Sequence, residues 1–267
     1  MKTYQLEIIE KIPEKLMFLH PLIFIHGAAG GAWYFSHFLD YFSEKGFHCY
    51  ALSLRGHGLS EGISDIDTFT MHDYVYDVKS LVDKLDQKPV LIGHSMGGAI
   101  TQTYMGLYQH TIKEAILLSS ARAGGIDETS PLGLFFSDAR SFLREMRKKD
   151  GHESMTIDDL MNEVIFSDRF EPHELSLIKK KLTRESKAVK KDLLKPFIKE
   201  GFKLKIPVSV IGSTGDHIIS LKDLEQTAEF FHTKPILVKD CCHFLTIDPN
   251  WMEVADTIYK ILSVNLG

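Results

Sequence analysis

Short apolar runs alternate with longer segments of helical periodicity along this 267-residue chain. This alternation constrains the fold most, because it is typical of a parallel sheet whose strands are joined by crossover helices. Each run is apolar on both faces, as expected of a strand buried between two helix layers. The predicted strands are Leu22–Ile25, His48–Leu54, Val90–Ile92, Ala115–Ser119, Val208–Ile211 and Ile236–Val238. The predicted helices lie near residues 33–45, 70–86, 95–109, 221–231 and 251–262.

The helix expected at residues 70–86 carries its own start signal. Thr70 can cap the helix, and Asp73, three positions later, suits the positive end of the helix dipole. Apolar residues then recur at helical spacing, at Tyr74, Val78, Leu81, Val82 and Leu85. The pattern therefore predicts a capped, amphipathic helix.

The alternation stops between about residues 122 and 205, where no strand-like run occurs and the pattern is helical throughout. We therefore expect residues 1–121 and 206–267 to form an α/β body, and residues 122–205 to form an inserted helical cap. The first half of this insertion is apolar, whereas its second half is basic.

Residues 179–205 carry 11 Lys or Arg against three acids, which leaves 20 basic and 33 acidic residues in the rest of the chain. A solvated helix face explains this surplus, because apolar residues at helical spacing supply a buried stripe. The stripe would consist of Leu175, Ile178, Leu182, Val189, Leu193 and Leu194. The alternative is a basic rim that attracts anionic substrates or lipid head groups.

The overall composition, 44% apolar and 25% charged, is that of an ordinary water-soluble globular protein. A formal net charge of −5 gives no basic surplus, so we expect no nucleic-acid partner. The apolar runs are far shorter than the roughly 20 residues of a membrane helix. Residues 1–15 carry charges throughout and lack the apolar core of a signal peptide. We therefore expect no integral membrane segment and a cytoplasmic location.

Sequence patterns for metals and cofactors are absent. The CxxC and HExxH patterns do not occur, and neither does a Cys/His quartet. The Gly-rich segment that begins at Gly27 has neither the spacing nor the Lys of a phosphate-binding loop. The three cysteines, Cys49, Cys241 and Cys242, are expected to be buried like small apolar residues. We expect no metal and no cofactor.

The most informative segment spans residues 90–99, where G-x-S-x-G stands between an apolar strand and a helical pattern. A serine in this position lies on a sharp turn that exposes its hydroxyl, and the flanking glycines leave room for the backbone. The start of the following helix adds free N–H groups and a positive dipole end. Ser95 is therefore the predicted nucleophile.

A serine hydroxyl needs a base to remove its proton, and the base works best when a third group holds its tautomer. Asp216 lies in a Gly-rich turn after one predicted strand, and His243 follows the last predicted strand. The order Ser95, Asp216, His243 is that of the α/β-hydrolases. The alternatives left open are Asp240 and Asp248 for the acid and His217 and His232 for the base.

Because it contains Ser95, Asp216 and His243 in this order, the sequence resembles α/β-hydrolase fold serine esterases and lipases of the lysophospholipase and monoacylglycerol-lipase-like branch. The resemblance extends over nearly the whole chain. It rests on residues 22–27 (LIFIHG), 55–60 (RGHGLS), 93–97 (GHSMG), 212–216 (GSTGD) and His243. The segment 26–33 (HGAAGGAW) is also similar to plant methylesterases and hydroxynitrile lyases.

The resemblance implies an α/β-hydrolase fold, with a mostly parallel central sheet flanked by helices and an inserted helical cap. It also implies that the backbone N–H groups of Ala28 and Met96 stabilise an oxyanion. Arg55 and His57 are expected to shape a turn after a strand rather than to take part in the chemistry.

Ser95 stands where related dehalogenases and epoxide hydrolases use an Asp, so the resemblance implies acyl transfer. We expect hydrolysis of a carboxylic ester with an apolar acyl or alcohol part. The candidate pocket residues are Leu134, Phe135, Phe136, Met155, Met161, Ile165, Ile218 and Phe244. Those in the insertion would equally serve to dock the cap on the body. The alternatives are an acyl thioesterase and a catalytically silent ligand-binding protein of the same fold.

Overall fold

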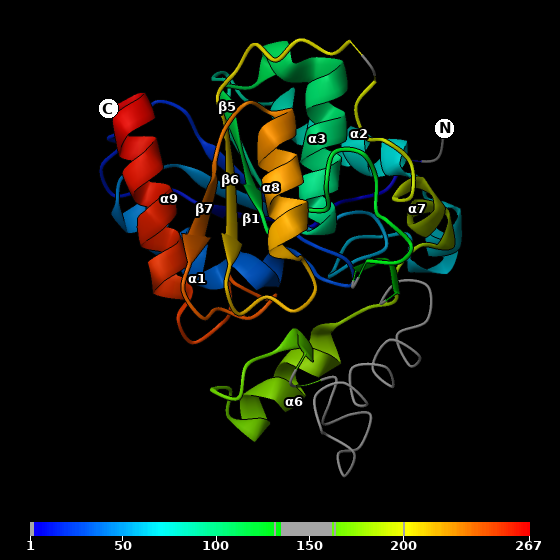
Figure 1. Cartoon of the computed structure of the whole chain (residues 1–267). Helices are drawn as coiled ribbons and strands as arrows, with labels where there is room; N and C mark the ends of the chain where they lie inside the picture. Colours follow the sequence, from blue (N-terminus) through cyan, green and yellow to red (C-terminus); the bar gives the residue numbers. More distant parts are fainter. Residues whose placement is uncertain (1–2, 131, 135–161, 163, 200) are drawn as a thin grey trace.

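A seven-stranded, mostly parallel sheet forms the centre of the molecule (Figure 1). The computed structural model describes residues 3–130, 132–134, 162, 164–199 and 201–267. The strand order is β1-β3-β2-β4-β5-β6-β7, and β1 is antiparallel to β3 whereas the other pairs are parallel. The strands are β1 (Ile8–Lys11), β2 (Leu22–Ile25), β3 (Cys49–Leu52), β4 (Val90–His94), β5 (Glu114–Leu118), β6 (Val208–Ser213) and β7 (Pro235–Val238).

Helices cover both faces of this sheet. Helices α1 and α9 pack on one face, and α2, α3 and α8 pack on the other. The helices are α1 (Ser36–Glu44), α2 (Met71–Val82), α3 (Met96–Tyr108), α6 (Pro172–Lys181), α7 (Lys187–Asp192), α8 (Leu221–Phe230) and α9 (Trp251–Leu266). Short 3₁₀ turns are η1 (Ala32–Phe35), η2 (Ile63–Thr68) and η3 (Gln109–Thr111). This is the α/β architecture that the alternating pattern predicts.

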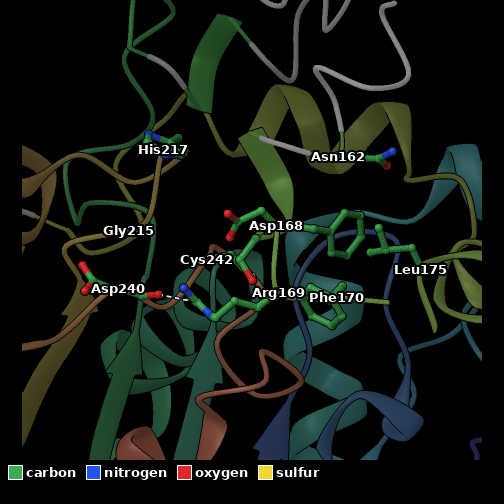
Figure 2. Close-up of a pocket in the computed structure, with 11 residues that line it drawn as sticks. Asn162, Asp168, Arg169, Phe170, Leu175, Gly215, His217, Asp240 and Cys242 are labelled. Atoms are coloured by element: carbon green, nitrogen blue, oxygen red, sulfur yellow. Dashed lines mark hydrogen bonds between the residues drawn. The ribbon is translucent and has the colours of Figure 1, made fainter. Parts of the chain in front are cut away.

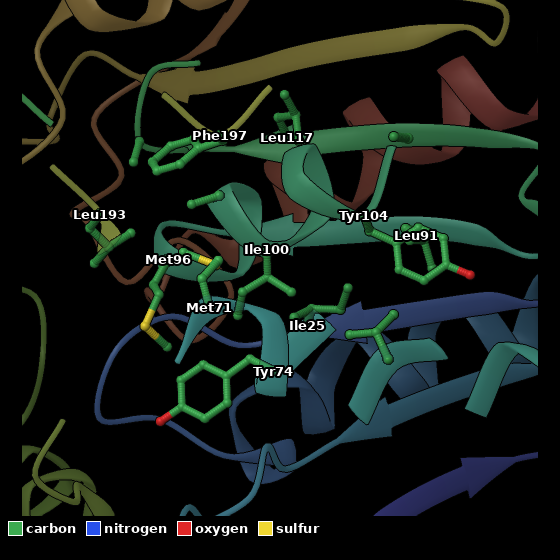
Figure 3. Packing of buried hydrophobic residues seen from close by; sticks show 14 of the residues in the cluster. Ile25, Met71, Tyr74, Leu91, Met96, Ile100, Tyr104, Leu117, Leu193 and Phe197 are labelled. Atoms are coloured by element: carbon green, nitrogen blue, oxygen red, sulfur yellow. The ribbon is translucent and has the colours of Figure 1, made fainter. Parts of the chain in front are cut away.

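The two apolar cores follow the rule that successive residues of a strand point to opposite faces. Leu22 and Phe24 of β2 pack in the core beside α1 and α9, whereas Ile23 and Ile25 pack in the core beside α2 and α3. Figure 3 shows the second core, where Ile25 lies near Ile100 of α3. Because both faces of β2 are covered, all four of its side chains are buried.

All six predicted strands are present, with ends that match the prediction or differ from it by at most two residues. Strand β1 was not predicted, because only Ile8 and Ile9 in it are apolar and it lies at the sheet edge. It forms by pairing with β3, where Ile8 lies opposite Leu52 and Lys11 opposite Cys49. Such a short edge strand depends on a partner that is distant in the sequence.

All five predicted helices are also present. The capping of α2 is confirmed, since the Asp73 N–H donates to Thr70 Oγ1 at 3.4 Å and the Thr70 N–H donates to Asp73 Oδ2 at 2.9 Å. The segment predicted near 33–45 is divided into η1 and α1, and α9 continues beyond the predicted end at residue 262. No helix within the described ranges is long and apolar enough to cross a bilayer.

The strand order reverses at β2, which lies between β3 on one side and β4 on the other. In an open α/β sheet, a crevice forms at the carboxyl ends of the strands where the order reverses. The loop after β2 holds Gly27 to Gly31, and the turn after β4 holds Ser95. The fold therefore brings the Gly-rich loop and the predicted nucleophile together.

Between β5 and β6, the described residues contain the helices α6 and α7 and no strand. Figure 1 shows α6 beyond the ends to which the arrows of β6 and β7 point. Of the predicted apolar stripe, Val189 and Leu193 are buried, but Leu194 is 41% exposed and does not belong to it. Leu193 and Phe197 pack in the core formed with α2 and α3 (Figure 3). The second half of the insertion is thus docked on the body.

Candidate active site

Ser95 lies at the sharp turn between β4 and α3. Its φ of 53° and ψ of −114° fall in a region that residues with side chains rarely adopt, so the turn holds backbone strain. Close packing requires glycines nearby: a Cβ on Gly93 would collide with the carbonyl oxygen of Gly97, and a Cβ on Gly97 with that of Ile25. The glycines of the pattern therefore allow helix α3 to start directly against the strands.

Ser95, His243 and Asp216 form a chain of hydrogen bonds. The Ser95 hydroxyl donates to His243 Nε2 at 3.1 Å, and the Nδ1–H of the same ring donates to Asp216 Oδ2 at 2.9 Å. All three residues are buried; Ser95 follows β4, Asp216 follows β6 and His243 follows β7. The fold thus brings together the three side chains that the sequence pattern selects.

The surroundings of Asp216 keep its carboxylate charged. Burial alone would raise the pKa of Asp216, but the charge of His243 and its hydrogen bond hold that pKa below its usual value. The N–H groups of Ile218 and Ile219 also donate to Asp216 Oδ1, at 2.8 and 2.9 Å. A charged, fixed carboxylate favours the Nδ1–H tautomer, which leaves Nε2 as the acceptor that faces Ser95.

His94, the residue before the nucleophile, fixes the backbone of His243. Its Nε2–H donates to the His243 carbonyl at 2.8 Å, and the two ring centroids lie 4.9 Å apart. Burial and then the neighbouring His243 lower the pKa of His94 to about 3, so this ring is neutral at pH 7. His94 therefore acts as a neutral donor that holds the loop of His243.

A buried carboxylate anchors the same loop from another side. Asp248 accepts a hydrogen bond from the Cys242 N–H at 2.9 Å and pairs with Arg169 of the insertion at 3.1 Å. The Asp248 side chain is fully buried. The bonds of Asp248 are therefore structural, and the carboxylate that contacts His243 is that of Asp216.

The other residues considered from the sequence lie elsewhere. Asp240 is exposed and contacts Thr214. His217 and His232 are exposed, and within the described residues neither has a hydrogen bond to Ser95. His57 is fully buried, but its Nε2–H donates to Glu185 rather than to a member of the Ser95 chain.

The two backbone N–H groups expected to hold an oxyanion come from different elements. Met96 begins α3, where the first N–H groups of a helix have no partner within the helix. Ala28 lies in the loop after β2 and lines the same cavity as Ser95. Within the described part of the chain, neither N–H donates a hydrogen bond. Both remain available to a bound oxygen.

The insertion holds the loop that carries Ala28. The N–H of the next residue, Ala29, donates to Glu185 Oε2 at 3.2 Å, and its carbonyl accepts from the Thr183 N–H at 2.9 Å. Ala29 has a positive φ of 61°, which is uncommon for a residue with a side chain. The two bonds therefore stabilise a loop conformation that the chain would not favour alone.

Glu185 is a buried residue that sequence reasoning missed. Its Oε1 accepts from the Tyr74 hydroxyl at 2.9 Å and the Ser186 N–H at 2.7 Å, and its Oε2 accepts from His57 Nε2–H at 3.0 Å. Burial opposes its charge, but the charge and hydrogen bond of His57 hold the pKa of Glu185 below its usual value. The sequence feature that could have pointed to Glu185 is its negative charge, because it is the single acidic residue among the lysines and arginine of residues 179–191.

A cavity of about 560 Å³ opens over Ser95 and His243. Three of the predicted pocket residues, Ile165, Ile218 and Phe244, line it. Its wall also contains Tyr34 of η1 and His94 of β4. The remaining residues of the wall come from the Gly-rich loop and the insertion: Gly27, Ala28, Ala29, Gly30, Leu132, Phe166, Lys179, Leu182, Glu185 and Lys190. The wall is mostly apolar, and its charged side chains all come from the insertion.

The other pocket candidates do not line this cavity or cannot be described. Leu132 lines it instead of Leu134, which is 39% exposed. The two lie in one helical turn, where residues two apart point in nearly opposite directions. Phe135, Phe136, Met155 and Met161 lie outside the described residues.

A second cavity of about 580 Å³ lies between the insertion and the loops that carry Asp216 and His243 (Figure 2). Phe170 and Arg169 line it from the insertion, and Gly215 and Cys242 line it from the body. Figure 2 shows Arg169 extended toward the Asp240 carbonyl, to which it donates a hydrogen bond. The insertion thus contacts the loop that carries His243 through Arg169.

The three cysteines are buried, as expected from the sequence. Burial raises the pKa of Cys241 to about 12 and that of Cys242 well above its ordinary value, so both thiols are protonated at pH 7. The described residues contain no group of three or more His, Cys, Asp or Glu side chains placed to hold a metal ion.

Comparison with known proteins places this geometry in a family. The model of the alpha/beta hydrolase fold matches residues 20–249, most of the chain. The chain belongs to the alpha/beta hydrolase fold family. Ser95, Asp216 and His243 all lie within the matched residues.

Curated relatives of this hydrolase are distant. A "Putative non-heme haloperoxidase" of Mycobacterium phage D29 is 23% identical over 206 residues, which cover 74% of this chain and 72% of the phage protein. A "Putative esterase/lipase 2" of Mycoplasma pneumoniae is 33% identical over 101 residues, 38% of this chain and 37% of that protein. The second match thus spans little more than a third of either protein.

Solved structures share the fold over nearly the full length. A monoacylglycerol lipase of Paleococcus ferrophilus superposes with a TM-score of 0.73 at 19% identity, covering 98% of this chain and 99% of the lipase. A thermophilic esterase from Thermogutta terrifontis gives a TM-score of 0.76 at 18% identity, covering 99% and 95%. At these identities the likeness concerns the fold.

Proposed function

We propose that this hydrolase cleaves carboxylic esters with an apolar acyl or alcohol part, through an acyl-enzyme on Ser95. The observation that carries the proposal is the chain from Ser95 Oγ through His243 to a charged Asp216, with bonds of 3.1 and 2.9 Å. Ser95 and His243 line a mostly apolar cavity of about 560 Å³. Esterases and lipases among the similar proteins support the same reaction class.

In the proposed mechanism, His243 Nε2 takes the proton of Ser95 while Oγ attacks the ester carbonyl. The carbonyl oxygen becomes an oxyanion that accepts hydrogen bonds from the N–H groups of Ala28 and Met96. His243 then gives its proton to the leaving alcohol as the C–O bond breaks, which leaves an acyl-serine. A water molecule attacks this acyl group by the same route and releases the carboxylic acid.

We also propose that residues 122–205 form a cap that shapes the substrate cavity. Ile165, Phe166 and Leu182 of this segment line the cavity over Ser95. Glu185 and Arg169 connect the segment to the loops of Ala28 and His243 respectively. Substrate binding and the geometry of the catalytic loops would therefore depend on the same segment.

Hydrolysis of acyl thioesters such as acyl-CoA is a second candidate, favoured by the two lysines that line the cavity wall, Lys179 and Lys190. The test compares p-nitrophenyl esters and acyl-CoA thioesters of equal chain length. A higher kcat/KM for the esters supports our first proposal. A clear preference for the CoA series would replace it.

The reaction class is tested with p-nitrophenyl esters from acetate to dodecanoate. We expect turnover by the unmodified protein and a loss of roughly 10³-fold or more in kcat for Ser95→Ala and His243→Gln. Lack of turnover of every ester in the series, or full activity of Ser95→Ala, would contradict the proposal.

A further inference from the structure

Two lysines from different helices of the insertion lie on the wall of the Ser95 cavity. Lys179 belongs to the last turn of α6, and Lys190 belongs to α7. Lys190 is partly buried, whereas Lys179 is exposed at the rim. Neither ammonium has an ion pair with a carboxylate among the described residues. A lysine on the wall of a mostly apolar cavity, with no paired carboxylate, favours a negative ligand group next to it.

Four other cations of the same segment have partners on the body or the surface. Arg184 and Lys187 contact Asp67 at 2.6 and 3.6 Å. Lys195 contacts Asp192 at 2.9 Å, and Lys181 lies over the Trp33 ring at 5.3 Å. In the part of the chain that the structure describes, Lys179 and Lys190 lack such a partner, as do the exposed Lys180 and Lys191, but of these four lysines only Lys179 and Lys190 line the Ser95 cavity.

Glu185 is the single acidic residue among those that line the described cavity, so its carboxylate is the candidate counter-charge for the two lysines. Four donors already surround its two oxygens: Ala29 N, His57 Nε2, Tyr74 Oη and Ser186 N. Its single negative charge is also outnumbered by the two lysines on the cavity wall. Its side chain is 4% exposed. The charge that the cavity presents to a ligand is therefore positive.

The rest of the cavity wall beside Ser95 and His243 is mostly apolar. Leu132, Ile165, Ile218 and Phe244 give an apolar surface beside Ser95 and His243. A ligand that fills this cavity meets catalytic groups, an apolar wall and two ammonium groups. The matching molecule has an ester, an apolar chain and an anionic end.

Resting on the proposed function, we propose that this site selects esters that carry an anionic group, a carboxylate or a phosphate, at the end of an apolar chain. Lys190 and Lys179 bind the anionic group as two point charges, with Lys190 as the more buried of the two. The apolar wall packs the chain between this group and the scissile carbonyl. The lysines thus determine specificity and take no part in bond making or breaking.

The test uses matched pairs of substrates. On the acyl side, p-nitrophenyl hexanoate is compared with the p-nitrophenyl monoester of adipic acid, and the octanoate with the monoester of suberic acid. On the alcohol side, hexyl acetate is compared with the acetate ester of 6-hydroxyhexanoic acid. Within each pair, the molecules differ in a terminal methyl or carboxylate. We expect kcat/KM about tenfold higher for the anionic member of at least one pair, decreasing as salt is added.

The variants are Lys190→Gln, Lys179→Gln and the double variant. We expect the ratio of kcat/KM within each pair to fall to within about twofold in the double variant, because kcat/KM decreases more for the anionic ester than for the neutral one. Lys191→Gln is the matched control, since Lys191 lies next to Lys190 on α7 but is exposed and does not line the cavity. That variant should keep the full preference.

Two results would overturn the proposal: equal kcat/KM within every pair, or a preference that the double variant retains. Turnover of the neutral esters separates these results from failure of the proposed function, which would abolish activity on all members.

Competition by hexyl phosphate and by hexanoate identifies the preferred anion. If neither inhibits better than hexan-1-ol, or if the advantage survives in the double variant, the anion site is refuted.

Discussion

Glu185 Oε2 accepts a hydrogen bond from the N–H of Ala29 at 3.2 Å, across 156 positions of the chain. This bond connects the insertion to the loop of Ala28, a residue that lines the same cavity as Ser95. His57, which also donates to Glu185, belongs to the turn after β3, so one buried carboxylate joins the insertion, the loop of Ala28 and this turn. Docking of the insertion and the geometry of the candidate oxyanion site are therefore coupled.

Replacement of Glu185 by Gln is expected to lower both activity and stability. Each carboxylate oxygen of Glu185 accepts from two donors, and Gln replaces one of these oxygens by an NH₂ group that cannot accept. Two buried donors therefore lose their acceptor, which lowers the free energy of unfolding by about 1–3 kcal/mol. With Ala29 less well held, we expect kcat to fall about tenfold while KM changes little, because the oxyanion forms in the transition state. Urea unfolding and ester kinetics measure both effects. The control is Glu225→Gln, an exposed change on α8, and equal behaviour of the two variants would refute the coupling.

Backbone strain at Ser95 predicts a difference between two inactive variants. Glycine adopts the φ of 53° and ψ of −114° freely, whereas alanine keeps the strain. After the larger entropy of glycine in the unfolded chain is included, we expect Ser95→Gly to be more stable than Ser95→Ala by about 0.5–1 kcal/mol. Urea unfolding of the two proteins measures this difference. A more stable Ser95→Ala would show that the turn is unstrained.

Two buried neutral histidines predict a loss of stability in acid. Burial, followed by the neighbouring His57 for His26 and His243 for His94, lowers the pKa of both His26 and His94 to about 3. An unfolded histidine has a pKa near 6.5, so between about pH 6.5 and 3 the unfolded chain binds protons that the folded chain does not. Stability is therefore complete above about pH 6.5 and falls with decreasing pH, by up to about 1.4 kcal/mol per unit for each ring.

This pH dependence is measured by urea unfolding at pH 7.5, 6.0 and 5.0. The informative variant is His94→Gln, which retains an N–H donor for the His243 carbonyl but does not titrate. We expect a shallower slope of stability against pH for this variant than for the unmodified protein. Identical slopes would show that His94 is not held neutral by the fold.

Features encoded locally could be predicted from the sequence. The strands at residues 22–25 and 90–94 follow from apolar runs, and Ser95 follows from glycines whose absent Cβ atoms permit the turn. Asp216 and His243 follow because parallel strands end at one edge of the sheet, so residues just after them converge. These inferences need only the local pattern and the rules of α/β topology.

Features that depend on distant partners could not be predicted. Glu185 and Arg169 occur in a segment whose helical pattern does not show which body residues it contacts, and their roles come from contacts with Ala29 and Asp248. Strand β1 is defined by its pairing with β3 rather than by its own residues. The facing of Leu132 rather than Leu134 depends on how one helical turn docks, which periodicity alone does not determine.

The central claim is that Ser95 is activated by His243 and Asp216. Labelling of the folded protein with a fluorophosphonate, followed by mass spectrometry, tests it most directly because the probe reacts with activated serines. We predict one adduct, on the peptide that contains Ser95, with no adduct in Ser95→Ala and strongly slowed labelling in His243→Gln. Absence of an adduct on the folded protein, or an adduct on another residue with Ser95 unmodified, would contradict the account.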